Sequence, residues 1–178
     1  VLCQHCDEAP CEPVCPVYAT YHNDQGLNVQ VYNRCVGTRF CANNCPYHVR
    51  FFNFWEPEWP ESLKNQLNPD VTVRGRGIME KCSFCVQRIQ RSTREAERDG
   101  VPVEDGDRGI TPACVNACPT SALNFGNFND QDSKVSKMKE DAMGDHGRGY
   151  KLMDNLGTDA NVVYLKKIDE GAEVSHGH

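Results

Sequence analysis

Eleven cysteines fall into three blocks of the 178-residue chain, and these are the residues whose type and spacing would carry chemistry. The blocks contain, in order, Cys3, Cys6, Cys11 and Cys15; Cys35, Cys41 and Cys45; and Cys82, Cys85, Cys114 and Cys118. Each block ends in the pattern C-x3-C-P. Thiolates are ligands for soft metal ions and clusters, so this repeated pattern predicts a metal-binding protein built from related units.

Three kinds of cysteine chemistry compete for this pattern. An odd count of cysteines cannot pair completely as internal disulfides, and the two cysteines of a C-x2-C motif are poor partners for each other. A tetrahedral zinc site needs two separated pairs, and Cys3 and Cys6 with Cys82 and Cys85 would supply one. Zinc leaves the C-x3-C-P ending unexplained. Iron–sulfur clusters explain it, because closely spaced thiolates hold one cluster and the cysteine before the proline ligates another.

The proline after each block predicts how ligands are shared between blocks. Proline fixes its own backbone angle and biases the preceding residue to an extended conformation, which turns that cysteine away from its local loop. Reciprocal sharing then assigns a [4Fe–4S] cluster to Cys3, Cys6, Cys11 and Cys45. A second cluster takes Cys15, Cys35 and Cys41.

The third block gives an incomplete set. Cys82, Cys85 and Cys114 form a triad for a further [4Fe–4S] cluster, but no cysteine of this chain remains as its fourth ligand, and Cys118 has no local triad to join. Both gaps close if a fourth cysteine block lies upstream or on another chain, donating one thiolate and receiving Cys118 into an additional cluster. Because the sequence opens at Val1 without Met, we expect that something upstream is missing from it.

The second block departs from the pattern at one position. Where C-x2-C is expected, the sequence reads Cys35-Val36-Gly37-Thr38, so Thr38 stands in the place of the middle cysteine. A neutral hydroxyl is a poor iron ligand beside a thiolate, so the iron at this corner would be weakly held or absent. We therefore predict a [3Fe–4S] cluster at this block. The alternatives are a [4Fe–4S] cluster with water or hydroxide on one iron, and a lost cluster.

Short elements between the blocks must position these ligands. The turn-forming run Asn23-Asp24-Gln25-Gly26 lies between β-forming residues and predicts a hairpin. Residues 83–99 are typical of a helix that stops at Gly100, and residues 121–125 and 161–168 of extended segments. Residues 49–70, rich in aromatic residues and proline, predict an ordered loop lying on another surface.

These elements predict an α+β fold of paired ferredoxin-like units, each a hairpin with a helix, wrapped around clusters and joined by long irregular loops. Hydrophobic residues make up 39% of the chain, so its core should be thin and metal binding should contribute much of its folding free energy. We expect an iron–sulfur domain over residues 1–128. Residues 129–178, which lack cysteine, should form a C-terminal extension packing on that domain or on partners.

Charge and hydropathy exclude some classes of partner. The 19 Lys and Arg residues against 25 Asp and Glu residues give a net charge of −6, which argues against nucleic acid. No apolar run reaches the length that a membrane-spanning helix needs. His176 and His178 would bind a metal only weakly, so a frayed terminus is the favoured interpretation. His48 and Arg50 follow Cys45 closely and either shape the electrostatics of a cluster or are ordinary exposed residues.

The blocks, their order and the threonine substitution resemble the four-cluster electron-transfer subunits of dimethyl sulfoxide, polysulfide and nitrate reductases, over residues 1–128. Within that group, RCVGTRFCANNCPYHVRFFNF, NPDVTVRGRGIMEKCSFCVQRIQ and ACVNACPTSALNFGNFND are most similar to the iron–sulfur domain of the B subunit of bacterial alternative complex III. In that family the domain follows a large molybdopterin-type domain that has lost its cofactor. The missing first block is a departure, whereas the missing middle cysteine is expected in this branch.

The resemblance implies a role in respiration. Electrons would come from menaquinol oxidised in an integral membrane quinol-binding subunit and pass toward haem c subunits and an oxidase, with the three-iron cluster nearest the quinol site. The resemblance also implies a peripheral position on the bacterial inner membrane, at its periplasmic face. The aromatic loop with Phe51, Phe52, Phe54, Trp55 and Trp59 is then a candidate docking surface for the membrane subunit, with packing over the clusters as the alternative.

Two other functions compete with this relay, which would have no substrate chemistry of its own. The first is an electron-transfer subunit of a molybdenum-containing reductase such as polysulfide reductase, in which a separate chain performs catalysis. The second is an interaction module held together by zinc. The polypeptide upstream of residue 1 discriminates the relay from the reductase subunit, and analysis for iron and acid-labile sulfide discriminates both from the zinc module.

Overall fold

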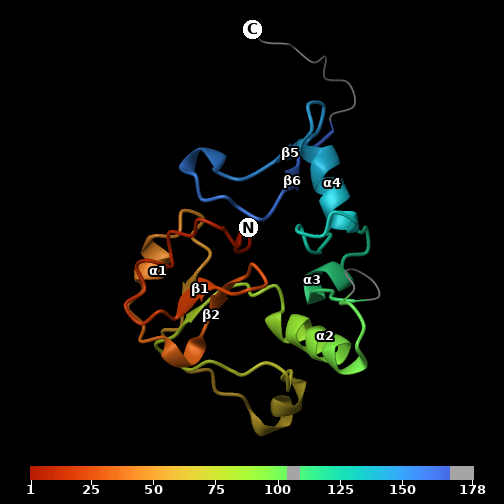
Figure 1. Cartoon of the computed structure of the whole chain (residues 1–178). Helices are drawn as coiled ribbons and strands as arrows, with labels where there is room; N and C mark the ends of the chain where they lie inside the picture. Colours follow the sequence, from red (N-terminus) through yellow and green to blue (C-terminus); the bar gives the residue numbers. More distant parts are fainter. Residues whose placement is uncertain (104–108, 169–178) are drawn as a thin grey trace.

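The structure is a computed structural model that describes residues 1–103 and 109–168. Helices and short antiparallel strand pairs are joined by long irregular segments (Figure 1). The strands are β1 (Thr20–His22), β2 (Asn28–Gln30), β3 (Phe51–Phe52), β4 (Met79–Glu80), β5 (Gly149–Tyr150) and β6 (Tyr164–Leu165). The α-helices are α1 (Phe40–Asn43), α2 (Val86–Asp99), α3 (Ala113–Asn116) and α4 (Lys134–Met143), and the 3-10 helices are η1 (Tyr32–Arg34), η2 (Glu61–Gln66) and η4 (Asp154–Leu156). The α+β class matches the prediction.

The first hairpin forms where the turn sequence predicted it. Strands β1 and β2 pair antiparallel, with Tyr21 opposite Val29. The side chain of Asn23 accepts hydrogen bonds from the backbone N–H groups of Gln25, at 3.2 Å, and Leu27, at 2.8 Å. Gly26 has a φ of +75°, a conformation that a residue with a Cβ adopts only with strain. The hairpin prediction is therefore confirmed.

A second strand pair joins the second and third cysteine blocks. Strand β3, just after Cys45, pairs antiparallel with β4, just before Cys82. The chain near Cys35 packs tightly against the segment leading into β4, because a Cβ added to Gly37 would lie 2.4 Å from the carbonyl oxygen of Gly77. The contact leaves no space for a side chain at position 37.

The helix predicted at residues 83–99 is present, but it begins three residues later. Phe84 and Cys85 have φ values of 53° and 56°, in the left-handed region, so regular helix starts only at Val86. The helix ends where glycine predicted it, since Gly100 adopts the left-handed conformation and its N–H caps the last turn.

Two predictions of extended structure need correction. Residues 121–125 form no strand, since Ser121 has a φ of 53° and none of the described strands pairs with this segment. Of residues 161–168, only Tyr164 and Leu165 form a strand, which pairs with β5. Alternation of residue types indicates an extended preference, but a strand also needs a partner, and these segments find little or none. The prediction for His176 and His178 lies outside the described residues.

Cysteines make up half of the main core. Its buried members are Cys3, Cys6, Ala9, Cys11, Cys41, Cys45, Tyr47, Val49, Met79 and Ala160. A second, smaller group of Leu27, Ile89 and Ile110 packs the first hairpin against α2. The main group contains only Val49 and Met79 as larger aliphatic side chains and the second group has only three buried members, which agrees with the expectation of a thin core.

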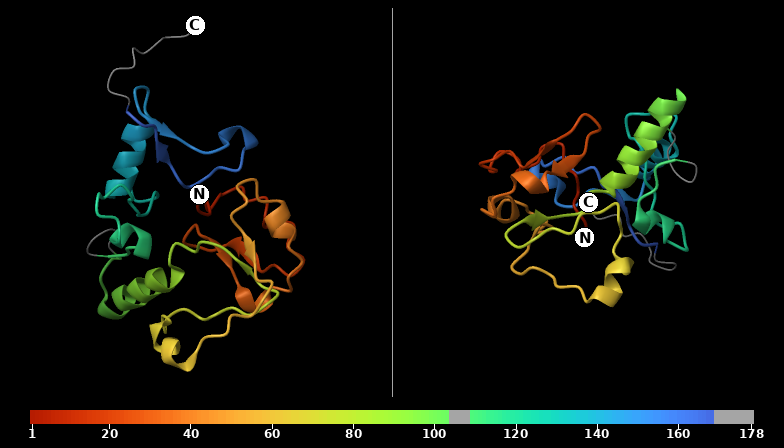
Figure 2. Two further views of the ribbon diagram at one scale, coloured as in Figure 1. Left: turned by 180° about the vertical axis from the view of Figure 1, so that it is seen from behind. Right: turned by 90° about the horizontal axis from the view of Figure 1, so that it is seen from below.

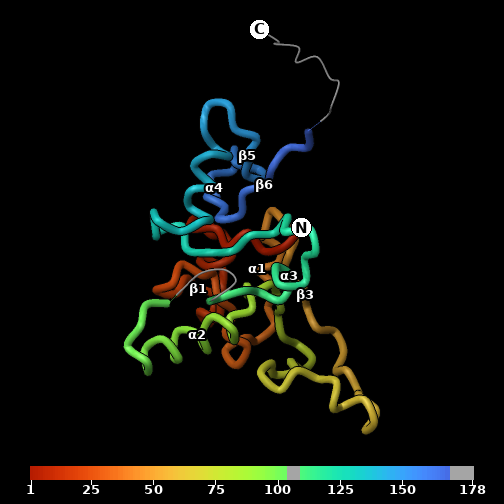
Figure 3. The backbone as a smooth tube through the Cα atoms, turned by 90° about the vertical axis from the view of Figure 1, so that its right-hand side faces the viewer, coloured from red at the N-terminus to blue at the C-terminus, as the bar shows by residue number. Residues whose placement is uncertain are grey.

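The N-terminal half, α2 with α3, and the C-terminal extension occupy different sides of the molecule. In Figures 1 and 3 the extension lies above the N-terminal segment, while residues 53–70, with η2, project at the opposite end. Figure 2 shows α2 beside the first hairpin rather than over the projecting loop. Within the described residues, no helix combines the length and apolar character needed to cross a bilayer.

Candidate metal centre

The C-x2-C turns of the three blocks share one backbone feature. The residue before the second cysteine has a positive φ in the first and third blocks, at His5 (45°) and Phe84 (53°). In the second block Gly37, at 75°, has the same place immediately before Thr38. Thr38 therefore lies at the backbone position that Cys6 and Cys85 hold in the other blocks.

The C-x3-C-P endings also repeat as structure. The backbone N–H groups of Cys15, Cys45 and Cys118 each donate to the carbonyl three residues earlier, at distances of 3.1, 3.3 and 3.1 Å. Three residues after each of these cysteines the chain turns, with the N–H groups of Tyr18, His48 and Ser121 donating to the respective cysteine carbonyls. All three turn residues have a positive φ between 52° and 53°. The internal repeat seen in the sequence is thus a repeat of backbone conformation.

The first predicted ligand set surrounds a single small cavity. Cys3, Cys6, Cys11 and Cys45 all line it, together with the apolar residues Ala9, Pro10, Pro46, Tyr47 and Val49. The four cysteines are buried, between 6% and 8% exposed. Cys45 comes from the second block, as reciprocal sharing requires. Four thiols around an apolar cavity fit a cluster that binds thiolates at its corners.

The second set is less enclosed. Cys41 is buried on α1, while Cys15 and Cys35 are half-buried. Backbone N–H groups point at two of these sulfurs, since Ala19 donates to Cys15 Sγ at 3.1 Å and Met79 to Cys35 Sγ at 3.4 Å. Such donors stabilise a thiolate and tune the potential of a cluster that it ligates. Thr38 is exposed at the edge of this set.

The third set lies open on the surface. Cys82, Cys85 and Cys118 are half-buried and Cys114 is exposed. The backbone N–H of Ala113 donates to Cys85 Sγ at 3.3 Å, which places the start of α3 beside the C-x2-C turn. Cys118 has partners in its own segment: hydrogen bonds from Thr120 and the following backbone lower the pKa of its thiol to about 7. The contact at Ala113 thus joins the segment of Cys114 to the C-x2-C turn.

Burial disfavours the thiolate form of two cysteines of the closed set. It raises the pKa of Cys6 to about 11, despite hydrogen bonds from Thr158 and Tyr47, and burial also raises the pKa of Cys11. These thiols are therefore protonated at neutral pH in the metal-free chain. Cluster binding must release their protons, because the thiolate is the ligand. Among the described residues, no three His, Cys, Asp or Glu side chains meet at a position suited to one metal ion.

Two buried cations lie beside the cysteines. Arg50 is 6% exposed and Lys81 is 8% exposed, whereas His48 is exposed. Arg50 donates from Nη2 to Cys11 Sγ at 3.0 Å, and Lys81 donates to the carbonyl oxygen of Cys82 at 3.0 Å. Of the two residues singled out after Cys45, the structure places Arg50 at the cysteines. Lys81 was missed, although its place directly before Cys82 was a signal.

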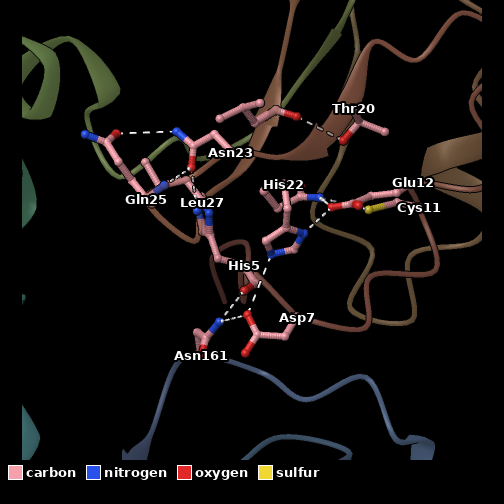
Figure 4. Close-up of polar contacts among 12 residues, drawn as sticks. His5, Asp7, Cys11, Glu12, Thr20, His22, Asn23, Gln25, Leu27 and Asn161 are labelled. Carbon is pink, nitrogen blue, oxygen red and sulfur yellow. Dashed lines mark hydrogen bonds and ion pairs between the residues drawn. The ribbon is translucent and has the colours of Figure 1, made fainter. Parts of the chain in front are cut away.

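A polar network leads from the first block to the surface. His22 Nδ1 lies 2.6 Å from Glu12 Oε1, and its other ring nitrogen lies 3.7 Å from Asp7 Oδ1 (Figure 4). Asn28, 1% exposed, donates to the same Glu12 oxygen at 2.5 Å and lies 3.7 Å from Cys11 Sγ. Glu12 is therefore already engaged by a histidine and an amide. Sequence patterns gave no signal for Asn28, because its role depends on the fold.

The C-terminal extension covers the first block. Tyr47 hydroxyl contacts Thr158 Oγ1 at 2.6 Å and donates to the carbonyl oxygen of Leu152 at 3.1 Å. Asn161 donates from its side chain to the carbonyl of His5 at 2.8 Å and to Asp7 at 2.6 Å (Figure 4). These bonds attach the extension to the wall of the cysteine cavity. Two buried polar atoms nearby, Gln4 Oε1 and His5 Nδ1, have no hydrogen-bond partner in the structure.

One part of the aromatic loop packs against the main core, and another part is exposed to solvent. Phe52 is half-buried and packs against the cysteine core, and the Arg39 side chain lies 5.2 Å from its ring centre. Phe51, Phe54 and Trp55 are 64%, 60% and 73% exposed. A groove of about 380 Å³ runs between this loop and residues 67–74. The loop thus presents a largely apolar surface next to the second cysteine set.

Comparisons show that the chain is similar to known iron–sulfur proteins. Residues 1–59 match the 4Fe-4S dicluster domain family. The chain is 41% identical, over 93% of its length, to the iron–sulfur cluster-binding subunit of menaquinone reductase from Nitratidesulfovibrio vulgaris, of which it covers 64%. It is 39% identical to the iron–sulfur subunit 1 of an Hdr-like menaquinol oxidoreductase from Archaeoglobus fulgidus, covering 93% of this chain and 56% of that protein.

A third relative is covered more completely. The chain is 30% identical to the iron–sulfur subunit of arsenate respiratory reductase from Shewanella sp. strain ANA-3, over 94% of this chain and 74% of that subunit. The chain thus spans between about half and three quarters of the length of these relatives.

Proposed function

Because the chain belongs to the family of iron–sulfur electron-transfer subunits of respiratory oxidoreductases, we propose that it relays electrons between a quinol-oxidising membrane subunit and haem subunits. Bound iron–sulfur clusters would supply one-electron redox chemistry. The residues of this chain hold the clusters, bury them and place them close together. The observation that carries the proposal is the apolar cavity lined by Cys3, Cys6, Cys11 and Cys45 from two different blocks.

The ligand assignment extends this observation to the remaining cysteines. We assign Cys3, Cys6, Cys11 and Cys45 to a [4Fe–4S] cluster, and Cys15, Cys35 and Cys41 to a [3Fe–4S] cluster at which Thr38 replaces a ligand. The positive φ that His5, Gly37 and Phe84 share supports the place of Thr38. Cys82, Cys85 and Cys114 would hold a further [4Fe–4S] cluster completed by a thiolate from outside this chain, and Cys118 would serve an additional cluster.

The projecting aromatic loop supports a direction for the relay. Its exposed rings adjoin the second cysteine set through Phe52, so a membrane subunit docked on the loop would deliver electrons at the three-iron cluster. The protein would lie peripherally on the bacterial inner membrane, at its periplasmic face, and pass electrons toward haem c subunits as in alternative complex III. Two relatives named for menaquinone or menaquinol reactions are consistent with quinol as the donor.

One of the relatives supports an alternative function. The relative covered to 74% is named for arsenate respiratory reductase, so the alternative is an electron-transfer subunit of a molybdenum-containing reductase, such as polysulfide reductase, with a separate catalytic chain. Purification of the native assembly separates the two functions. A co-purifying molybdenum-containing chain supports the alternative, whereas haem c subunits without molybdenum support the relay.

The cluster assignment has a direct spectroscopic test. Anaerobically purified, full-length protein should contain iron and acid-labile sulfide, and the oxidised sample should show a [3Fe–4S] electron-paramagnetic signal. Thr38→Cys should abolish that signal while raising the iron content by about one atom per chain, because the missing thiolate is restored. A silent oxidised wild-type sample would refute the three-iron cluster, and zinc in place of iron would refute the relay itself.

A further inference from the structure

Arg50 and Lys81 are buried charges without a direct counter-ion in the part of the chain that the structure describes. Neither side chain forms an ion pair with a carboxylate of residues 1–103 or 109–168. Burying a cation without a charged partner costs several kcal/mol or more, so such groups are expected only beside compensating negative charge. The carboxylate nearest in the network, Glu12, reaches Arg50 only through Asn28 and is bridged to His22.

The hydrogen bonds of Arg50 show what its charge faces. Its Nη1 donates to Gln30 Oε1 at 2.9 Å, and its Nη2 lies 2.7 Å from Thr20 Oγ1, 2.7 Å from Asn28 Oδ1 and 3.0 Å from Cys11 Sγ. Three of these acceptors are neutral and the fourth is a predicted cluster ligand. Arg50 also lies close enough to Cys41, the buried cysteine of the second set, for an electrostatic interaction. Arg50 therefore stands between the first and second ligand sets.

Lys81 lies close to Arg50, since both cations donate to Asn28. Its ammonium group donates to the carbonyl oxygens of Asn28 and Cys82. It also interacts electrostatically with Cys3, of the first set, and Cys82, of the third. Asn28 accepts from both cations, through its side chain for Arg50 and its backbone for Lys81. The two cations therefore lie close together, beside the ligand set of Cys3, Cys6, Cys11 and Cys45.

We propose that Arg50 and Lys81 raise the reduction potentials of adjacent clusters, Arg50 acting on the first and second and Lys81 on the first and third. This inference rests on the proposed cluster assignment. Reduction adds an electron to a cluster that the surrounding thiolates already make negative, and a fixed cation nearby stabilises the added charge. Because both cations act on the first cluster, it should be the easiest four-iron cluster of this chain to reduce, which would keep electrons moving inward from the second.

Redox titration of the assembled protein, followed by electron-paramagnetic resonance, tests the proposal. Arg50→Met should lower the potential of the three-iron signal and of a four-iron signal. Lys81→Met should lower only four-iron potentials and leave the three-iron potential unchanged. We expect the ratio of reduced to oxidised cluster at fixed ambient potential to fall at least tenfold, or about 59 mV for one electron. Arg50→Lys and Lys81→Arg, which keep the charge, should restore wild-type ratios within about threefold.

The matched control is Lys64→Met, which removes an exposed cation that pairs with Glu61 far from the cysteines and should shift no signal. Clusters at wild-type iron and sulfide content with unchanged potentials in both methionine variants would overturn the proposal. So would a fall in the three-iron potential in Lys81→Met. If Arg50→Met does not assemble, the four-iron potentials of Lys81→Met test the proposal. Absence of clusters from the wild type is a different result, which would refute the proposed function instead.

Discussion

The closed first set and the open third set have related backbones but opposite surroundings. Cys45 closes the first set from a neighbouring block, and the C-terminal extension covers it through Tyr47 and Thr158. The third set keeps the left-handed residue of its C-x2-C turn and the same C-x3-C-P hydrogen bond, yet Cys114 is exposed. The ligand loops are therefore shaped locally by the cysteine motif, whereas burial comes from distant segments. The ligand loops of the third set thus share these local features with those of the first set without being buried.

The largest expected effect separates these two sets. Cys45→Ala should remove the first cluster, with a loss of about four iron atoms per chain, because three thiolates from one block no longer complete the cavity. Cys118→Ala should leave the iron content of the first and second clusters unchanged, since Cys118 serves neither. Iron and sulfide analysis measures the total loss in each variant, and electron-paramagnetic resonance of the reduced protein identifies the cluster that is missing. Retention of the first cluster in Cys45→Ala, or its loss in Cys118→Ala, would show that the blocks do not share ligands as proposed.

The tight packing at Gly37, in the second cysteine block, predicts a second contrast. Gly37→Ala should destabilise the protein by about 2 kcal/mol or more, because the added Cβ would meet the Gly77 carbonyl at 2.4 Å in a left-handed backbone. Gly100→Ala, at the end of α2, carries a similar φ of +66° but no neighbour within 4 Å, so it should cost only about 1 kcal/mol. Thermal unfolding compares the two variants, and equal destabilisation would contradict the close approach.

The cover over the first set predicts a smaller effect. Tyr47→Phe removes the hydroxyl that joins Thr158 and Leu152 and should cost about 1 kcal/mol. Cluster loss in air should then be faster for the first cluster than for the second. Tyr150→Phe, an exposed tyrosine of the extension, is the control and should change neither. Bleaching of the visible absorbance measures the total rate of cluster loss, and the three-iron signal measures the rate for the second cluster. An equal acceleration of the loss of both clusters would show that the extension does not protect the first site.

The smallest effect concerns the outer edge of this cover. Lys151, 2.5 Å away, lowers the pKa of the Asp159 carboxyl, so the pair stabilises the fold at neutral pH and this contribution is lost as the pH falls below about 4. The Asp159 side chain is 55% exposed, so Asp159→Asn should cost about 0.5 kcal/mol or less. The shift in melting temperature at pH 7 should shrink in 1 M salt. A shift independent of salt would indicate that the ion pair is not its cause.

Local signals in the sequence predicted the parts of the fold that local chemistry decides. Asn23 and Gly26 marked the first hairpin, and Gly100 marked the end of α2. The C-x3-C-P repeat predicted a repeated turn. The strand at residues 121–125 was wrong because strand formation depends on a partner that the sequence does not identify. The burial of Arg50 depends on packing between segments distant in the chain, so its charge alone did not indicate it.

The candidate site divides in the same way. The position of Thr38 follows from spacing, and in all three blocks the residue before this position has a positive φ. Only the fold shows that the third set is exposed. Only the fold shows, too, that residues 152–161 cover the first set, because the extension carries no metal-binding motif. Asn28 has an ordinary place in a strand, and only the structure shows that it accepts hydrogen bonds from both buried cations.

Anomalous scattering at the iron edge, from crystals of the full-length protein grown without oxygen, tests the central claim most directly. We expect iron peaks for a four-iron cluster within Cys3, Cys6, Cys11 and Cys45, and for a three-iron cluster within Cys15, Cys35 and Cys41 with its open corner toward Thr38. A further four-iron cluster should lie at Cys82, Cys85 and Cys114, completed by a thiolate from outside residues 1–178. A single metal ion at any of these sets, or a cluster held by one block alone, would contradict the reciprocal assignment.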